Sequence, residues 1–286
     1  MIAGTRGSRL ALTQTSMFAE AMAEHSVIPS IKIIKTAGDA DQLSDLRDMG
    51  GYGAFVRELD NALLAREIDV SVNSMKDVPV LGRENITIGA VMKRASCEDV
   101  ILPMPIADLP RGAVVGSSSV RRSAILRSIR PDLEIRGLRG NVDTRLGKLD
   151  KGEYDAIILA KAGFERLGIK REMHTLSADE FVPAPGQGAI AVACRSSDKE
   201  IIEILKKVDD ADARTETAAE RTIMRMMGGI CSSPIGINAR KEGNGLRIRA
   251  VFFDDAETRR YDSVIPINHT LQDLQGVAAM LKGGIK

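Results

Sequence analysis

The chain has 286 residues, of which 44% are hydrophobic and 28% are charged, and this composition is typical of a soluble globular protein of two or three domains. Its 40 Lys and Arg residues nearly balance its 39 Asp and Glu residues, so we expect no whole-molecule attraction to nucleic acid or to anionic lipid. Aromatic residues make up only 3% of the chain, which argues against base stacking and against a membrane-interface belt.

Segments that direct a protein out of the cytoplasm are not predicted. Residues 1–12 contain Arg6 and Arg9 but no apolar stretch of signal-peptide length, so we expect no secretory signal. No apolar run approaches the ~18 residues that a membrane span needs. The 3 cysteines include no CxxC pair and predict neither a disulfide framework nor a thiolate zinc site. We therefore expect a cytoplasmic protein without a metal.

Strand-like and helical segments alternate over the first two thirds of the chain. Strands are predicted at 31–35, 69–74, 86–91, 113–116, 134–138, 156–160 and 189–194. Helices are predicted at 11–24, 53–66, 119–129, 142–151 and 199–208. This alternation is typical of βαβ units and predicts an α/β fold.

Two stretches rich in turn-forming residues are predicted to connect domains. Residues 92–110 contain three prolines, and residues 181–188 contain a Val-Pro-Ala-Pro-Gly-Gln-Gly run that stops any helix. Because a strand-like run follows the second connector, the chain is predicted to return there to its first domain. We predict a discontinuous domain 1 at 1–92 with 189–208, and domain 2 at 98–182.

The last quarter of the chain has a different pattern. A helix is predicted at 212–227, strands at 246–253 and 259–265, and a closing helix at 271–282. Strands and helices that are grouped in this way are typical of a small α+β domain, which we place at 212–286.

The strongest local signal for a binding site lies at 116–122, with the sequence GSSSVRR, where a predicted strand passes into a predicted helix. Ser117, Ser118 and Ser119 offer hydroxyl groups beside the unpaired backbone amides of the helix start. Arg121 and Arg122 add positive charge where a helix normally favours acidic residues. A bound carboxylate or phosphate would supply the missing negative charge. The alternative is a serine cap followed by solvated arginines.

A second junction of a strand and a helix, called a corner below like the one at 116–122, lies at 136–141. There Asn141 can cap a helix that carries Arg145 in its next turn. Arg139 belongs to this corner, and a weaker version occurs at 5–8. Residues 111–148 contain nine Lys and Arg against three Asp and Glu. Ligands of α/β sheets bind at the carboxyl ends of strands, so several such corners can converge on one polyanionic ligand.

Lys76 and Asp77 follow the predicted strand at 69–74, and Pro79 prevents that strand from continuing. A carboxylate at a strand end beside cationic groups can transfer a proton and stabilise positive charge on a substrate. The alternative is an ordinary solvated turn.

Cys231 lies in a Gly- and Pro-rich loop at 228–236. A thiol in such a loop can act as a nucleophile or as a point of attachment, although no histidine lies nearby in sequence to activate it. A small cysteine buried beneath a turn is an equally good interpretation of the spacing. Cys97 and Cys194 lie in a connector and in an apolar run, and we interpret them as structural.

Taken together, these motifs resemble the porphobilinogen deaminase family, also called hydroxymethylbilane synthase. The resemblance rests on ordered segments that are spread over most of the chain. They are TRGSRLAL at 5–12, SMKDVP at 74–79, GSSSVRR at 116–122, LRGNVDTRL at 138–146, PGQGA at 185–189 and the cysteine loop.

The resemblance implies an α/β protein with two periplasmic-binding-protein-like domains around a cleft and a small α+β C-terminal domain. It implies a monomeric transferase of tetrapyrrole and haem biosynthesis that joins four porphobilinogen units head to tail, with release of ammonia, into hydroxymethylbilane. The growing chain would extend from a dipyrromethane cofactor that is attached to Cys231 by a thioether. No nucleic acid or membrane partner is implied.

The resemblance also assigns roles to residues. Asp77 would be the catalytic acid, which protonates the leaving amine and then stabilises the positive charge of the azafulvene. The cofactor would be held by Cys231, Lys76, Ser117, Ser118, Ser119, Arg121, Arg122 and Arg145. The substrate would be held by Arg6, Ser8, Gln14, Arg139 and Gln187.

The main competing hypothesis is a two-lobed module that binds a polycarboxylate or an oxyanion without catalysis. It accounts for the clustered arginines but leaves Asp77 and Cys231 without a task. A nucleic-acid-binding module is a weaker alternative, because the charge is balanced and aromatic residues are scarce.

Overall fold

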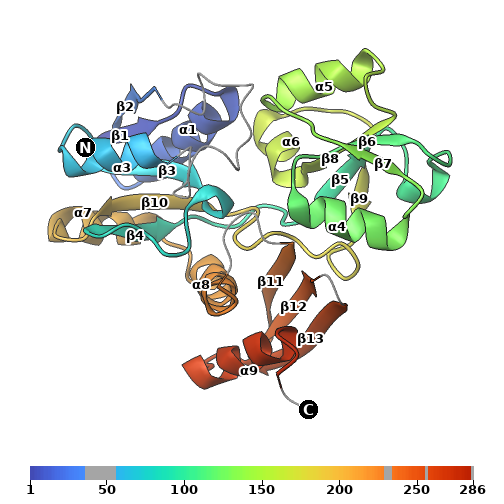
Figure 1. Cartoon of the computed structure of the whole chain (residues 1–286). Coiled ribbons are helices and arrows are strands. Elements are labelled where there is room, and N and C mark those ends of the chain that lie inside the picture. Colours follow the sequence, from blue (N-terminus) through green and yellow to red (C-terminus); the bar gives the residue numbers. More distant parts are fainter. Residues whose placement is uncertain (36–55, 229–233, 255–256, 285–286) are drawn as a thin grey trace. The chain divides into compact units, whose positions relative to one another are not determined.

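The computed structural model describes residues 1–35, 56–228, 234–254 and 257–284 (Figure 1). The chain forms two compact units. Unit 1 contains Met1–Ala95 and Gly188–Ala218, and unit 2 contains Ser96–Gln187 and Ala219–Lys286. In the described ranges, no helix combines the length and the apolar character that crossing a bilayer would require.

Unit 1 is built on a five-stranded sheet with the order β2-β1-β3-β10-β4. Its strands are β1 (Ile2–Thr5), β2 (Ser30–Ile33), β3 (Val70–Ser74), β4 (Ile86–Val91) and β10 (Ile190–Arg195). β1 runs parallel to β2 and to β3, whereas β10 is antiparallel to β3 and to β4. The segment after the second connector therefore pairs between two strands of the N-terminal sheet.

Helices cover both faces of this sheet. Side chains alternate between the faces of a strand, so Val192 of β10 lies in one core cluster and Ala193 in another. The helices α1 (Arg9–Ala23) and α7 (Lys199–Leu205) pack in the cluster of Val192 through Phe18 and Leu205. The helix α3 (Arg57–Leu64) packs in the cluster of Ala193 through Leu59.

Unit 2 contains a second five-stranded sheet, with the order β7-β6-β8-β5-β9. Its strands are β5 (Asp99–Leu102), β6 (Val114–Gly116), β7 (Glu134–Arg136), β8 (Ala156–Ala160) and β9 (His174–Leu176). The helices α4 (Val120–Ile129), α5 (Val142–Asp150) and α6 (Lys161–Leu167) lie around it (Figure 1).

A three-stranded antiparallel sheet completes unit 2. It has the order β11-β12-β13, with β11 (Ile235–Glu242), β12 (Gly245–Phe253) and β13 (Thr258–Pro266). The helix α9 (Leu271–Leu281) follows this sheet, and α8 (Ala211–Met226) precedes it. Val251 of β12 packs in the same core cluster as Ile125, Phe181 and Val182, so the small sheet shares a core with the five-stranded one. The predicted α/β fold with a small α+β C-terminal region is confirmed.

Each predicted strand and helix overlaps an element of the structure, but several elements were not predicted. β5 lies inside the predicted connector 92–110. It was not predicted because Pro103 and Pro105, which follow it, suggested a loop. β1 and β9 are short, and β11 contains Gly236 and Asn238, which strands usually disfavour. α6 begins directly after β8 without a side-chain cap, so no starting signal marked it.

Candidate functional site

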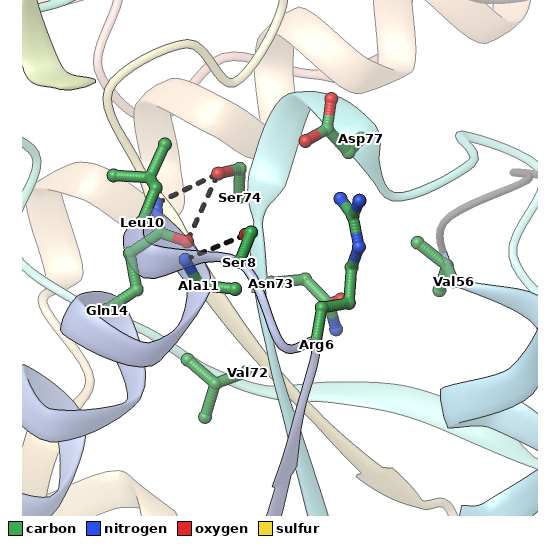
Figure 2. Close-up of a pocket in the computed structure, with 10 residues that line it drawn as sticks. All are labelled: Arg6, Ser8, Leu10, Ala11, Gln14, Val56, Val72, Asn73, Ser74 and Asp77. Carbon is green, nitrogen blue, oxygen red and sulfur yellow. Dashed lines mark hydrogen bonds between the residues drawn. The ribbon is translucent and has the colours of Figure 1, made fainter. Parts of the chain in front are cut away.

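A pocket in unit 1 lies at the carboxyl ends of β1 and β3 (Figure 2). These strands run parallel, so their carboxyl ends meet at one edge of the sheet, where ligands of α/β proteins commonly bind. The pocket is lined by Arg6, Ser8, Leu10, Ala11, Gln14, Val56, Val72, Asn73, Ser74 and Asp77. Four of the predicted site residues, Arg6, Ser8, Gln14 and Asp77, therefore lie together.

The first turn of α1 forms one wall of the pocket. Ser8 caps this helix, and its hydroxyl accepts a hydrogen bond from the backbone N–H of Ala11 at 3.3 Å. The first turn contains no acidic residue. The remaining N–H groups of that turn and the partial positive charge of the helix start therefore favour an anionic group in this pocket.

Gln14 and Ser74 connect α1 to the end of β3. The Gln14 Nε2 donates a hydrogen bond to the Ser74 Oγ at 2.9 Å, and Gln14 is only 2% exposed. Ser74 and Asn73 also line the pocket, although neither was predicted as a site residue. Their place directly before Lys76 and Asp77, at the end of a predicted strand, was the signal that could have identified them.

Asp77 is positioned by the residue two places before it. Met75 is 1% exposed and packs in a core cluster with Val91 and Ala191. Its backbone N–H donates to Ala189 O at 3.0 Å, which fixes the start of the 3-10 helix Met75–Asp77. With Met75 inside, Lys76 and Asp77 are half-buried. Asp77 lines the pocket, and the Arg6 side chain extends toward it in Figure 2. Lys76 is not among the lining residues.

Two corners of the unit 2 sheet are joined by a serine. The Ser118 Oγ donates to Leu138 O at 2.8 Å and accepts from Leu138 N at 2.9 Å. Ser119 caps α4 by accepting from Arg122 N at 3.4 Å, and the Ser117 Oγ accepts from Ser119 N at 3.3 Å. The start of α4 and the segment before α5 are thus held together.

The corner before α5 has the predicted local structure. Asn141 caps α5 by accepting a hydrogen bond from Thr144 N at 2.8 Å. The Arg145 Nε donates to Gly140 O at 2.8 Å, which keeps this guanidinium beside the start of its own helix. Arg139 is half-buried in the same corner. The structure therefore brings Ser117, Ser118, Ser119, Arg139 and Arg145 together in unit 2.

The arginine pair is buried and bonded to Asp99 of β5. The Arg121 Nη2 lies 2.8 Å from Asp99 Oδ2, and the Arg122 Nη2 lies 2.7 Å from Asp99 Oδ1. The remaining Nη1 groups donate to backbone carbonyls, Arg121 to Val182 at 2.8 Å and Arg122 to Ile158 at 3.0 Å. The alternative of solvated arginines is wrong, and Asp99 is a partner that no sequence motif indicated.

Charge in this cluster is not balanced. Two guanidinium groups share one carboxylate, so these three side chains carry one positive charge in excess. The buried Arg121 Nε has no hydrogen-bond partner among the described residues. The first turn of α4 contains no acidic residue. These features fit a nearby anionic group, because a buried charge is stable only when it is compensated.

Asp99 stays ionised in this cluster. Burial alone would raise its pKa, but the positive charges of Arg121 and Arg122 and their hydrogen bonds hold the pKa of Asp99 well below its usual range. A lowered pKa contributes stability that is complete above the unfolded value of about 3.9 and is lost as the pH falls toward the folded value.

Gln187 belongs to the same cluster. It is 1% exposed, and its Nε2 donates to Cys97 O at 2.6 Å and to Asp99 Oδ1 at 2.9 Å. The structure thus places Gln187 in unit 2, bonded to Asp99, and it is not among the described residues that line the pocket of unit 1. Its predicted contact with substrate stays a prediction.

The three cysteines lie in different surroundings. Cys97 and Cys194 are 1% and 0% exposed, as the structural interpretation requires. Burial raises the pKa of the Cys194 thiol to about 11, so this thiol stays protonated and unreactive. Cys231 lies outside the described residues, and its attachment role stays a prediction.

Two family models match the chain. One describes the dipyromethane cofactor binding domain of porphobilinogen deaminase and matches residues 1–203. The other describes the C-terminal domain of porphobilinogen deaminase and matches residues 214–282. The chain belongs to the porphobilinogen deaminase family. The first match covers the pocket of unit 1 and the arginine corner of unit 2, and the second covers the loop with Cys231.

Curated relatives agree with this assignment. A probable porphobilinogen deaminase of Methanosarcina acetivorans is 44% identical over 93% of this chain and 86% of its own length. A second from Methanocella arvoryzae is 41% identical over 99% of this chain and 95% of its own. The porphobilinogen deaminase of Bacillus cereus is 39% identical over 100% of this chain and 96% of its own.

Solved structures are similar in fold at low sequence identity. An ABC transporter from Parabacteroides distasonis is 11% identical with a TM-score of 0.44, covering 78% of this chain and 72% of that chain. A putative periplasmic sulfonate-binding protein from Methylobacillus flagellatus is 12% identical with a TM-score of 0.43, covering 73% of this chain and 65% of that chain.

Asp99, Arg121 and Arg122, called the Asp99 cluster below, form a buried ion pair that two arginine substitutions on α4 can test. We expect Arg122→Ala to lower the free energy of unfolding by about 1.5–3 kcal/mol, the cost of losing a hydrogen bond to a charged group. Arg127 is exposed on the same helix, so Arg127→Ala should change this free energy by no more than about 0.5 kcal/mol. Urea denaturation measures both. Equal unfolding free energies for the two variants would contradict the buried ion pair.

Proposed function

We propose that the chain catalyses the head-to-tail joining of four porphobilinogen units into hydroxymethylbilane, with release of one ammonia per unit. This is the transferase step that supplies a linear tetrapyrrole for haem and related pigments. The observation that carries the proposal is the pocket of unit 1, which brings Asp77 together with Arg6, Ser8 and Gln14 in a member of this family.

In this pocket Asp77 is proposed as the catalytic acid. A carboxyl group there can give its proton to the departing amine of porphobilinogen. The resulting carboxylate then stabilises the positive charge that is left on the substrate carbon. Arg6, Ser8 and Gln14 are proposed to bind the substrate's acetate and propionate groups, because a guanidinium and a helix start both favour carboxylates.

The dipyrromethane cofactor is proposed to be attached through a thioether to Cys231. When bound, it supplies the terminal pyrrole carbon from which the chain grows. Its carboxylates are proposed to be held by Lys76, Ser117, Ser118, Ser119, Arg121, Arg122 and Arg145. The excess positive charge of the Asp99 cluster and the capped start of α4 support these contacts in unit 2. Arg139 and Gln187 are proposed to contact substrate.

We further propose a cytoplasmic monomer with three domains, at 1–92 with 189–208, at 98–182 and at 212–286. The two five-stranded sheets and the three-stranded sheet support this division. The balanced charge supports the absence of nucleic acid and membrane partners.

The proposed function is tested by incubating the purified full-length chain with porphobilinogen and measuring ammonia and tetrapyrrole together. We expect one ammonia for each porphobilinogen consumed and one linear hydroxymethylbilane for each four. Binding of porphobilinogen without ammonia release would instead favour a non-catalytic polycarboxylate-binding module.

A further inference from the structure

The segment 181–187, called the connector segment below, touches the Asp99 cluster at two points. Val182 O accepts a hydrogen bond from the Arg121 Nη1 at 2.8 Å. At the other end of the segment, the Gln187 Nε2 donates to Asp99 Oδ1 at 2.9 Å. The connector segment is therefore bonded to Arg121 near one end and to Asp99 at the other.

The same segment is bonded to the start of β11. Pro183 O accepts a hydrogen bond from Ile237 N at 2.9 Å. At Gly236 the strand approaches so closely that an added Cβ would lie 2.6 Å from Val182 O. β11 begins at Ile235, four residues after Cys231 in the sequence. One short segment thus lies between the arginine cluster and the strand that follows the cysteine loop.

Glu220 of α8 links the connector segment to β11. Its Oε2 accepts a hydrogen bond from Gly186 N at 2.6 Å, and its Oε1 accepts from Ala239 N at 2.7 Å and from the Asn238 Nδ2 at 3.3 Å. Glu220 is 0% exposed. Hydrogen bonds from backbone amides to a buried carboxylate are strong, so this one side chain holds two separate backbone segments.

We propose that Glu220 is a positioning residue for cofactor attachment. By holding Gly186 and Ala239 it sets β11, and with it the exit of the cysteine loop, relative to Arg121 and Arg122. This inference rests on the proposed attachment of the cofactor to Cys231. A glutamine at this position cannot replace the carboxylate, because its amide NH₂ would face one of the two backbone N–H donors.

The test compares Glu220→Gln with Glu216→Gln in the full-length chain. Glu216 lies one turn earlier on α8, is 5% exposed and pairs with Arg94 at 3.1 Å in unit 1. Both variants therefore lose a buried carboxylate on the same helix, and Glu220 is the one whose Oε2 accepts a hydrogen bond from Gly186 N of the connector segment. Each chain is produced without cofactor in a host that makes no porphobilinogen, and covalent loading is followed by intact mass after porphobilinogen is added.

We expect Glu220→Gln to slow covalent loading by roughly tenfold or more, because small misplacements of reacting groups have large effects on rate. Glu216→Gln should load within about twofold of wild type at a temperature where both variants are folded. Hydrogen exchange at the Gly186 and Ala239 amides should become faster in Glu220→Gln alone. A merely structural role would instead slow loading in both variants in parallel with their loss of thermal stability.

Three outcomes are separable. Wild-type loading rate in Glu220→Gln, with faster exchange at Gly186 and Ala239, would overturn the positioning role. If Glu220→Gln does not fold, Gly236→Ala provides the same test without a change of charge, since it moves β11 away from Val182; loading at the wild-type rate would overturn the proposal. A wild-type chain that takes up no covalent mass would contradict the proposed cofactor attachment itself.

Discussion

Asp77→Asn is expected to lower the turnover of porphobilinogen by about 10²–10⁴-fold, the usual contribution of a positioned acid or base. Asn has nearly the shape of Asp but no proton to give and no negative charge. The 3-10 helix that carries Asp77 is fixed by the buried side chain of Met75 and by its bond to Ala189, so the variant should keep the pocket intact. Steady-state ammonia release measures the effect.

A matched control is Asp108→Asn. Asp108 is also the last residue of a 3-10 helix, Ile106–Asp108, but it is exposed and belongs to unit 2, whereas the pocket residues belong to unit 1. We expect this variant to turn over at the wild-type rate, and both variants to keep the cofactor mass. A loss smaller than tenfold in Asp77→Asn would show that another group transfers the proton.

The residues around Asp77 could be placed from the sequence because their signals are local. An apolar strand that ends before Pro79 puts Lys76 and Asp77 at a strand end, and the structure shows that end at Ser74. Ser119 and Asn141 were recognisable as helix caps for the same reason, since a cap depends on residues within one turn. The convergence of parallel strand ends then brings Arg6 and Asp77 to one pocket.

The partners of the arginines could not be predicted in this way. Asp99 is 22 positions from Arg121 in the sequence, and the two meet only because β5 and the start of α4 belong to the same unit. The prolines after β5 favoured the prediction of a loop, so the strand that carries Asp99 was not predicted. Glu220 is likewise 34 positions from Gly186, so its contact depends on tertiary packing that no local pattern records.

Because Asp99 neutralises one of the two arginines, less positive charge is available to a ligand than the sequence suggested. The sequence suggested two uncompensated guanidinium groups, whereas the structure leaves one positive charge in excess among the three side chains. The corner is still expected to attract an anion, but the attraction is expected to be weaker. An anion there would meet one net charge, the serine hydroxyls and the helix start, and not a pair of independent cations.

Cys231→Ala is expected to abolish turnover and to remove the covalent cofactor. The purified wild-type chain should exceed its sequence mass by two porphobilinogen units less two ammonia. Brief exposure to porphobilinogen should add a ladder of single pyrrole units to that mass. Cys231→Ala should show neither the offset nor the ladder in intact mass spectrometry, and it should unfold at a lower temperature, because a bound ligand favours the folded state.

The control for this loss is Cys194→Ala, which removes a different thiol. Cys194 is buried among apolar side chains of unit 1, and burial raises the pKa of its thiol to about 11, so we expect no thioether there. Cys194→Ala should therefore lose some stability and keep the full mass offset, whereas Cys231→Ala loses the offset. The two effects separate a packing role from an attachment role. An offset that persists in Cys231→Ala, or that maps to a peptide containing Cys97 or Cys194, would place the attachment point elsewhere.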